Sequence, residues 1–303
     1  MKITLKQLAV FDAAARLGSV SAAAGEVHVT QSAASLALQD LERALGVQLF
    51  HRHRRNLTLN ENGRRLQPKA RSTLMLIAEI EGESGGGLSG VLRVAASPTI
   101  GNYLMPRICA DFLDAHPGVQ VKLVIANEPE IIEQVENLVF DLGFVEGVSM
   151  RHMLMVEPLV GDSLAIVANP AHWAVGKRLN MAQLERESWY LQSIGASARH
   201  AFTGPYSWLL GSGSITFETN SIEAIKGAVV AGEGIGCLSR LAVAEELRRG
   251  QLAELTVRGF NIQRSFYMIS HKGVYEGGVH TAFVEQARKL RPAPQPGAQK
   301  RDR

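Results

Sequence analysis

The sequence predicts an α+β protein built from an N-terminal winged helix-turn-helix, a long linker helix and a two-lobed α/β domain. Three observations lead to this fold class. Residues 5–63 hold three short amphipathic helical patterns and a basic hairpin, residues 63–90 continue as a helical seam that ends in glycines, and residues 91–290 alternate between strand and helix patterns. A chain of 303 residues is long enough for two or three domains.

The head, residues 1–60, is predicted to begin with two helices, of which the second is short. Four apolar residues recur there at helical spacing, namely Leu5, Leu8, Phe11 and Ala15. Gly18 then supplies a stop, and Ser21 is expected to be the N-cap of a second helix that ends near His28. Two helices separated by only a few residues favour a helix-turn-helix.

A third helix is predicted to begin after Thr30, which can cap it, and to end at Gly46. Its buried stripe is expected to consist of Ala34, Leu38, Leu41 and Leu45. Its other face carries mostly Gln31, Ser32, Ser35 and Gln39. Glutamine and serine hydrogen-bond to base edges, and the amide groups of a helix N-terminus favour a phosphate, so this helix is predicted to enter a DNA groove.

Residues 47–60 predict a wing made of two short extended runs. Their connection contains Arg52, Arg54 and Arg55, cations that we expect on the phosphate backbone. Residues 1–71 hold eleven Lys and Arg against five Asp and Glu, whereas the whole chain has a net charge of +3. A basic head on a mildly acidic body is expected when only one end meets a polyanion. An ordinary helical subdomain with a solvated charged hairpin is the plainer alternative.

Residues 5–63 closely resemble the N-terminal domain of LysR-type transcriptional regulators. The resemblance is carried by Leu8 and Phe11, the Gly18-Ser19 turn, TQSAAS, LERALG, LF followed by Arg52, and LTLNENG. It implies DNA binding, and the contact residues that we expect are Ser21, Thr30, Gln31, Ser32, Ser35, Gln39, Arg52, Arg54 and Arg55. The family usually has a basic residue directly after the serine of the third helix, where this chain has Leu36.

The linker, residues 61–90, is predicted to be a dimerisation helix followed by a glycine hinge. Its coiled-coil-like seam consists of Leu66, Ala70, Thr73, Ile77 and Ile80. Packing of this helix against the chain's own domain remains the alternative. Pro68 is expected to bend the helix locally, and the glycines between residues 82 and 90 are expected to let the flanking domains move relative to one another.

Residues 91–292 are predicted to form the α/β domain. In its first unit LRVAAS, VQVKLVIAN and DLGFVEG are predicted strands, with helices between them. LVGDSLAIVAN is predicted to cross into a second unit, and RSFYMISH to return before a terminal helix. This organisation is similar to the periplasmic-binding-protein-like effector domain of the same family. It implies lobe I at 91–162 and 267–292 and lobe II at 163–266. The Pro-rich and charged composition of the end of the chain predicts a disordered tail at 293–303.

Ligands of open α/β sheets bind at the carboxyl ends of strands, where helix N-termini point their amides at them. Small polar residues follow three predicted strands here, and only Glu146 adds a nearby acid. We therefore expect a small anionic effector between the lobes, held by Ser97, Thr99, Asn102, Phe144, Ser193 and Asn220. The plainer alternative is that these serines are only helix caps. The family more usually has a GSGTR-like stretch at SIGASAR, which leaves Gly195 and Arg199 outside this set.

Other motifs favour no catalytic or cofactor chemistry. GEGIG follows a helix and not a strand, which predicts a tight helix-to-strand turn instead of a dinucleotide loop. No serine or cysteine sits in an elbow motif, and no Cys/His cluster has the spacing of zinc ligands, so we expect no enzyme, cofactor or metal. Cys109 and Cys237 are expected to be free thiols. No apolar run approaches a membrane span, and the cytoplasm is the expected compartment.

The sequence thus predicts a transcriptional regulator controlled by a small anionic effector. The resemblance implies a homodimer or homotetramer that reads an interrupted palindrome in double-stranded DNA and contacts RNA polymerase. Several stretches, among them DLGFVEG and NSIEAIKGAV, look closest to the branch that responds to sulfur oxyanions or related small anions. Two alternatives remain: a small-molecule binding protein with an incidental basic head, and an architectural DNA-binding protein whose effector lobes serve only oligomerisation.

Overall fold

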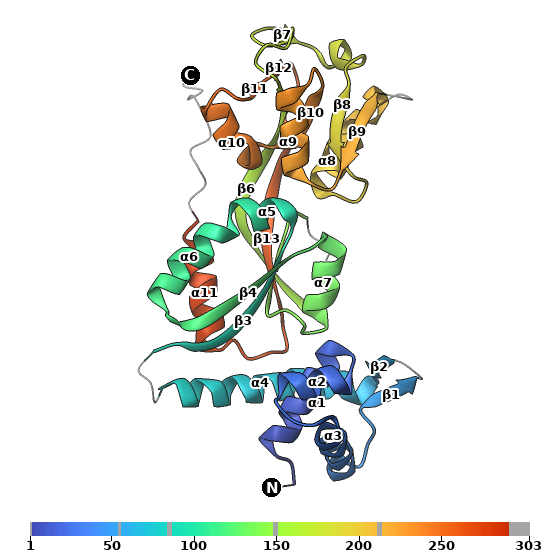
Figure 1. Ribbon diagram of the computed structural model, residues 1–303, viewed down its shortest axis with the longest axis vertical. Coiled ribbons are helices and arrows are strands. Elements are labelled where there is room, and N and C mark those ends of the chain that lie inside the picture. The colour runs from blue at the N-terminus through green and yellow to red at the C-terminus, as the bar shows by residue number, and fades with distance from the viewer. Residues whose placement is uncertain (1, 54–55, 84–86, 148–150, 211–213, 291–303) are drawn as a thin grey trace.

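The computed structural model describes residues 2–53, 56–83, 87–147, 151–210 and 214–290. Figure 1 shows an elongated molecule with the head and the linker helix at one end, lobe I in the middle and lobe II at the other end. The predicted tail lies outside the described residues. No helix within the described ranges has the length and apolar character needed to cross a membrane.

The head contains the predicted three helices and hairpin. They are α1 (Leu5–Leu17), α2 (Val20–Glu26), α3 (Gln31–Leu45), β1 (Phe50–His53) and β2 (Asn56–Leu59). Thr4 and Gln7 form a reciprocal capping box at the start of α1, and Gly18 ends that helix in a left-handed conformation. The predicted cap of α2 was wrong: Ser19 is the N-cap and accepts from the amide of Ala22, whereas Ser21 lies within the helix. The reason is that α2 begins at Val20, two residues earlier than predicted, so the residue before it, Ser19, is the cap.

The helices of the head enclose one apolar core. Phe11, Ala34 and Leu41 are completely buried, and the ring of Phe11 meets that of Phe50 edge to face at 5.6 Å. Of the predicted stripe of α3, Ala34, Leu38 and Leu41 are buried and Leu45 packs against the same core. The wing is therefore anchored to the helices through Phe50.

Gly63 marks the join between the wing and the linker helix, and it permits a close backbone approach. A Cβ atom at this position would lie 2.2 Å from the carbonyl oxygen of Leu49 and 2.6 Å from a methyl carbon of Leu59. Gly63→Ala is therefore expected to destabilise the head by about 1–3 kcal/mol, measured by thermal unfolding. Gly25→Ala is the matched control, because nothing lies within 4 Å of a Cβ there and alanine favours the helix. Equal melting temperatures for the two variants would contradict this account.

The linker helix α4 (Glu61–Glu83) runs through Pro68. Leu66 and Ala70 of the predicted seam pack against the core of the head, so this part follows the alternative of packing within the chain. Ile80, further along the seam, is 60% exposed. The hinge is shorter than predicted, because α4 continues through Gly82 and the next strand already begins at Ser89; residues 84–86 lie outside the described ranges.

Lobe I has a parallel sheet with helices on both faces. Its elements are β3 (Ser89–Ala96), α5 (Pro98–Tyr103), α6 (Met105–Ala115), β4 (Gly118–Ile125), α7 (Glu128–Glu136), β5 (Leu142–Val145) and the terminal helix α11 (Gly278–Arg288). Strand β3 pairs in parallel with β4 and β5. One face of the sheet packs against α6 and α11 through residues such as Phe112 and Phe283, and the other packs against α7 through Ile131. The short helix α5 was not predicted.

Two long strands join the lobes, as predicted. Strand β6 (Leu154–Ala168) and strand β13 (Gln263–His271) pair antiparallel, from Ser163 with Gln263 to Leu154 with His271. Among the described residues nine strands of the two lobes form one sheet, in the order β4-β3-β5-β13-β6-β10-β8-β9 with β11 on β6, whereas two short strands of lobe II form a separate pair. The lobe boundaries that we predicted near residues 162 and 267 therefore fall inside continuous strands.

Lobe II repeats the arrangement of a parallel sheet between helices. Its larger elements are β8 (Trp189–Gln192), α8 (Ser197–Tyr206), β9 (Ile215–Thr219), α9 (Ile222–Ala231), β10 (Ile235–Ser239) and α10 (Arg240–Arg248). The smaller ones are β7 (Arg178–Leu179), two 3₁₀ turns (Met181–Leu184 and Ser207–Leu209), β11 (Ala253–Glu254) and β12 (Thr256–Val257). Trp189 and Phe202 pack in one core beside α8, and Ile225 and Val243 pack in another between α9 and α10. Helix α10 was not predicted from the sequence.

Candidate DNA-binding face and effector cleft

The outer face of α3 has the composition that the sequence predicted. Gln31, Ser32 and Gln39 are exposed, and Ser35 is partly exposed. Thr30 caps the helix: its hydroxyl accepts from the amide of Ala33 at 3.2 Å and lies 3.1 Å from the hydroxyl of Ser32. The cap satisfies the amide of Ala33, and the hydroxyls of Thr30 and Ser32 lie at the exposed N-terminal end of the helix, where a DNA backbone can meet them.

The predicted wing contacts are only partly within the structure. Strands β1 and β2 pair antiparallel, with Arg52 opposite Leu57. Arg54 and Arg55 lie outside the described residues. Ser21, the remaining predicted contact, lies exposed on α2. The wing and α3 are parts of the same small domain because Phe50 and Leu41 belong to one core.

The predicted effector residues of lobe II lie side by side. The amide of Ser193, at the end of β8, donates to the carbonyl of Thr219, directly before Asn220. Ser221, the residue after Asn220, caps α9 by accepting from the amide of Ala224 at 3.2 Å. Ser193 is not a cap, because α8 begins four residues later and its N-cap, Ala196, provides no side-chain hydrogen bond.

Lobe I contributes Thr99 and Asn102 from α5, next to lobe II. Thr99 is buried, whereas Asn102 is exposed and donates to the carbonyl of Pro98. Tyr103, at the end of the same helix, donates its hydroxyl to Glu223 at the start of α9. Burial and the hydrogen bond to Glu223 both raise the pKa of Tyr103, so the phenol stays protonated and remains a donor. This hydrogen bond joins α5, the helix of Thr99 and Asn102, to α9, which begins two residues after Asn220.

Lys226 strengthens the same contact between the lobes. Its ammonium group lies 2.8 Å from Glu223, 2.7 Å from Glu246 and 5.1 Å from the centre of the Tyr103 ring. Burial opposes the charged ammonium, but the two carboxylates outweigh it and raise the pKa of Lys226. The cation thus holds α9, α10 and α5 together.

The structure gives Ser97 and Phe144 other contacts than we predicted. The hydroxyl of Ser97 donates to Glu146 at 2.8 Å and forms no side-chain cap for α5. Its proton is therefore not available to a ligand in this arrangement. Phe144 is fully buried in the core of lobe I, where its ring contacts Phe283, and so it does not line the cleft. Only its carbonyl reaches the site, where it accepts from the amide of Ser97.

A buried charge network runs along the two crossing strands. Arg264 on β13 donates to Glu146 of lobe I and, at 2.7 Å, to Asp162 on β6. The second oxygen of Asp162 accepts from Ser239 of lobe II at 2.9 Å. The side chains of the arginine and both acids are at most 7% exposed. These hydrogen bonds join the lobes where β6 and β13 cross between them. The sequence patterns did not predict that Glu146 and Asp162 share one arginine.

Arg199 is the functional candidate that sequence reasoning left out. It lies on the first turn of α8, only 9% exposed, and donates at 3.4 Å to the carbonyl of Gln192, the residue before Ser193. No carboxylate lies within ion-pair distance of it among the described residues, unlike the buried side chains of Arg16, Arg71 and Arg264. The sequence indicated Arg199 only through its place in SIGASAR, where the family more usually has a GSGTR-like stretch. That Arg199 is buried without a counter-ion is visible only in the folded chain.

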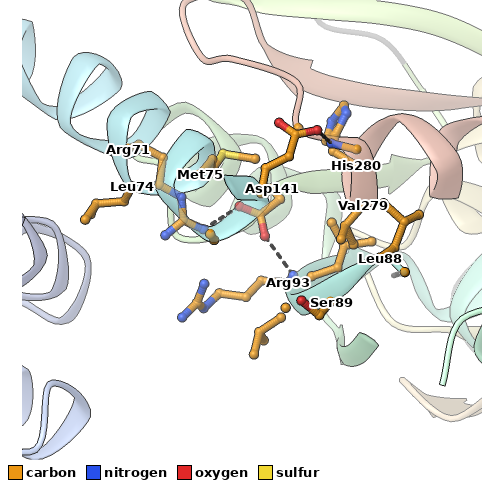
Figure 2. A pocket seen from close by; sticks show the side chains of 17 residues that line it. Arg71, Leu74, Met75, Leu88, Ser89, Arg93, Asp141, Val279 and His280 are labelled. Carbon is orange, nitrogen blue, oxygen red and sulfur yellow. Dashed lines mark hydrogen bonds and ion pairs between the residues drawn. The ribbon is translucent and has the colours of Figure 1, made fainter. Parts of the chain in front are cut away.

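A second ionic network connects the head to lobe I. Arg71 of α4 donates to Asp12 of α1 at 3.0 Å and to Asp141 directly before β5. Asp141 also accepts from the amide of Arg93 on β3. Burial opposes the charge of Arg71, but Asp141 and Asp12 outweigh it and raise its pKa above the ordinary value. Figure 2 shows Arg71, Arg93 and Asp141 beside a cavity between α4, β3 and α11. The cavity has a volume of about 670 Å³ and is lined largely by apolar groups such as Leu74 and Val279.

The comparisons with known proteins agree with this arrangement. Residues 5–64 match the model of the bacterial regulatory helix-turn-helix protein, lysR family, and residues 85–291 match the LysR substrate binding domain. The chain belongs to the LysR family of bacterial transcriptional regulators, and it is a DNA-binding regulator with an effector-binding domain. It is 35% identical over 285 residues to the HTH-type transcriptional regulator YeiE of Escherichia coli, covering 94% of this chain and 97% of YeiE.

Solved structures share the fold. A full-length OxyR from Pseudomonas aeruginosa matches with a TM-score of 0.73 at 19% identity, covering 95% of this chain and 99% of OxyR. The regulatory domain of CcmR from Synechocystis, in complex with 2-PG, matches with a TM-score of 0.61 at 27% identity, covering 68% of this chain and all of that domain. The first likeness concerns the fold of the full chain and the second concerns the two lobes.

Proposed function

We propose that this regulator senses a small anion bound between its two lobes, beside Arg199. The contacts of the anion would be Arg199 and Ser193 of lobe II with Thr99 of lobe I, together with Asn102 and Asn220 at the rim. The complex of the related CcmR domain with 2-PG supports an effector in this domain. No comparison favours the alternative of an architectural protein.

The observation that carries the proposal is the buried guanidinium of Arg199 without an acidic partner. Removing a cation from water costs several kcal/mol unless an opposite charge compensates it. A carbonyl 3.4 Å away compensates little. The N-terminal amides of α8 lack a side-chain cap and favour negative charge at the same point. An anionic effector would satisfy both.

The first test is the thermal stability of the full chain with a panel of sulfur, phosphorus and carboxylate anions. One anion is expected to raise the melting temperature saturably, since a ligand at about a hundred times its dissociation constant adds roughly 2.7 kcal/mol. Arg199→Gln should abolish the shift, and Thr99→Ala or Ser193→Ala should weaken it. Arg258→Gln, an exposed arginine of lobe II, is the control that should keep the shift. A shift that survives in Arg199→Gln would contradict the proposed site.

The assembly around this unit belongs to the same proposal. Two heads related by two-fold symmetry would read an interrupted palindrome in double-stranded DNA, with α3 in the major groove and Arg52, Arg54 and Arg55 on phosphates. The chain would act in the cytoplasm as a dimer or tetramer and contact RNA polymerase. An effector changes DNA binding only if its affinity differs between two arrangements of the chain. An effector could favour the arrangement of the lobes in which Tyr103 of lobe I is hydrogen-bonded to Glu223 of lobe II.

A further inference from the structure

Leu36 is an unusually exposed apolar side chain on the DNA-binding head. It is 55% exposed, more than any other large hydrophobic residue in the described part of α1–α3. Exposure of a leucine to water does not stabilise the fold, and single exposed leucines scattered over a surface are common. The position of this one, on the face of α3 that carries the predicted base contacts, sets it apart.

Helical geometry puts Leu36 in the middle of the exposed side of α3, next to the predicted base contacts. At about 100° per residue, it lies almost opposite the buried stripe of Ala34, Leu38 and Leu41. Gln39 and Ser32 are its neighbours three and four positions away in the helix, and both are exposed. A side chain that points directly away from the core of the head is the one that penetrates deepest when α3 lies in a groove.

Towards the N-terminal end of α3 this face is uncharged, and the nearest charged side chain on it is Asp40, four residues after Leu36. The basic residue of α3 is Arg43, near the C-terminal end, where it forms an ion pair with Asp40 at 2.7 Å. Leu36 therefore has no cation beside it on the helix and can offer only an apolar surface. In the major groove the apolar group that distinguishes one base from the others is the C5-methyl group of thymine.

We propose that Leu36 is a specificity residue that packs against the C5-methyl group of a thymine in each half-site. The inference rests on the proposed insertion of α3 into the major groove. Burying one methyl group against leucine corresponds to about fourfold in affinity per half-site, or ~0.8 kcal/mol. Two half-sites bound by a dimer would give roughly fifteenfold when both methyl groups are removed.

The test uses the full chain and double-stranded DNA obtained by in vitro selection with the same protein. Each thymine of the selected site is replaced in turn by deoxyuridine, which removes only the methyl group. Affinity is measured by fluorescence anisotropy at fixed salt concentration. Wild-type protein should lose about fourfold at one particular thymine of each half-site. If no thymine shows this loss, the proposal is overturned.

The variants decide whether Leu36 causes the effect. Leu36→Ala should bind thymine and deoxyuridine sites equally, whereas Leu76→Ala, an exposed leucine of α4, should keep the wild-type discrimination. The proposal is overturned if Leu36→Ala still distinguishes thymine from deoxyuridine. It is also overturned if a changed oligomeric state of Leu36→Ala explains the weaker binding. Gln31→Ala distinguishes failure of the Leu36 proposal from failure of the proposed role of α3. If Gln31→Ala alters sequence preference and Leu36→Ala does not, α3 contacts the bases without Leu36. If neither variant alters it, α3 is not the helix that recognises the DNA sequence.

Discussion

Arg264→Met is expected to destabilise the two-lobed domain by about 3–5 kcal/mol, because it leaves two buried carboxylates without a counter-charge. The side chains of Glu146 and Asp162 are each 3% exposed, so water cannot replace the guanidinium. The effect should reach lobe II, since Asp162 is also the acceptor of Ser239. Methionine keeps much of the volume of arginine, which limits the contribution of lost packing.

Tryptophan fluorescence during urea unfolding provides the measurement. All three tryptophans of the chain, Trp173, Trp189 and Trp208, belong to lobe II, so the signal reports that lobe. Replacing the acids as well, in the triple variant with Glu146→Gln and Asp162→Asn, should restore most of the loss because no buried charge then remains. A triple variant as unstable as Arg264→Met would show that packing, and not charge, explains the effect.

Arg71→Met is expected to have an effect of similar size at the other junction. Arg71 compensates Asp12 of the head and Asp141 of lobe I at once, and the three side chains are at most 9% exposed. Without the guanidinium, Asp141 stays buried without its ion-pair partner and Asp12 keeps only Arg16, at 3.2 Å, at a cost of about 3–5 kcal/mol if the parts remain together. The chain can avoid that cost by separating the head and α4 from lobe I, which lets water reach the acids.

Separation can be measured directly. Small-angle X-ray scattering should give a larger radius of gyration for Arg71→Met, and circular dichroism at 222 nm should show an earlier thermal transition. Arg65→Met, an exposed arginine of the same helix, should leave both quantities unchanged. Adding Asp12→Asn and Asp141→Asn to Arg71→Met should restore the compact form. A compact and fully stable Arg71→Met protein would show that the ion pairs do not hold the junction.

The parts of the fold that the sequence predicted well are those with local causes. The stripe of α3 recurs with the helical period, and both Thr30 and Gly46 are caps within one residue of the helix. The strands of lobe I and the long crossing strands also carried their own patterns. The error at Ser21 is local as well, because Ser19 and Ser21 are both good caps and nothing in their immediate sequence favours one of them.

The candidate effector site was only partly predictable. Residues after strand ends could be placed near one another, because parallel strands bring their carboxyl ends to one edge of a sheet. The partners of those residues could not: Ser97 donates to an acid 49 positions away, and Arg264 binds that same acid across 118 positions. The sequence also could not show that Arg199 lacks an acidic partner, since that depends on every group around it.

The sequence by itself determined that this chain is a winged helix-turn-helix head, a linker helix and two α/β lobes, because helix period, strand alternation and caps act over a few residues. Tertiary structure alone decided which charges are compensated. Arg71 joins Asp12 and Asp141, 59 and 70 positions away, whereas Arg199 is buried beside a carbonyl. Burial makes the difference between these arginines matter, since the energy of a charge depends on whether water or an opposite charge surrounds it.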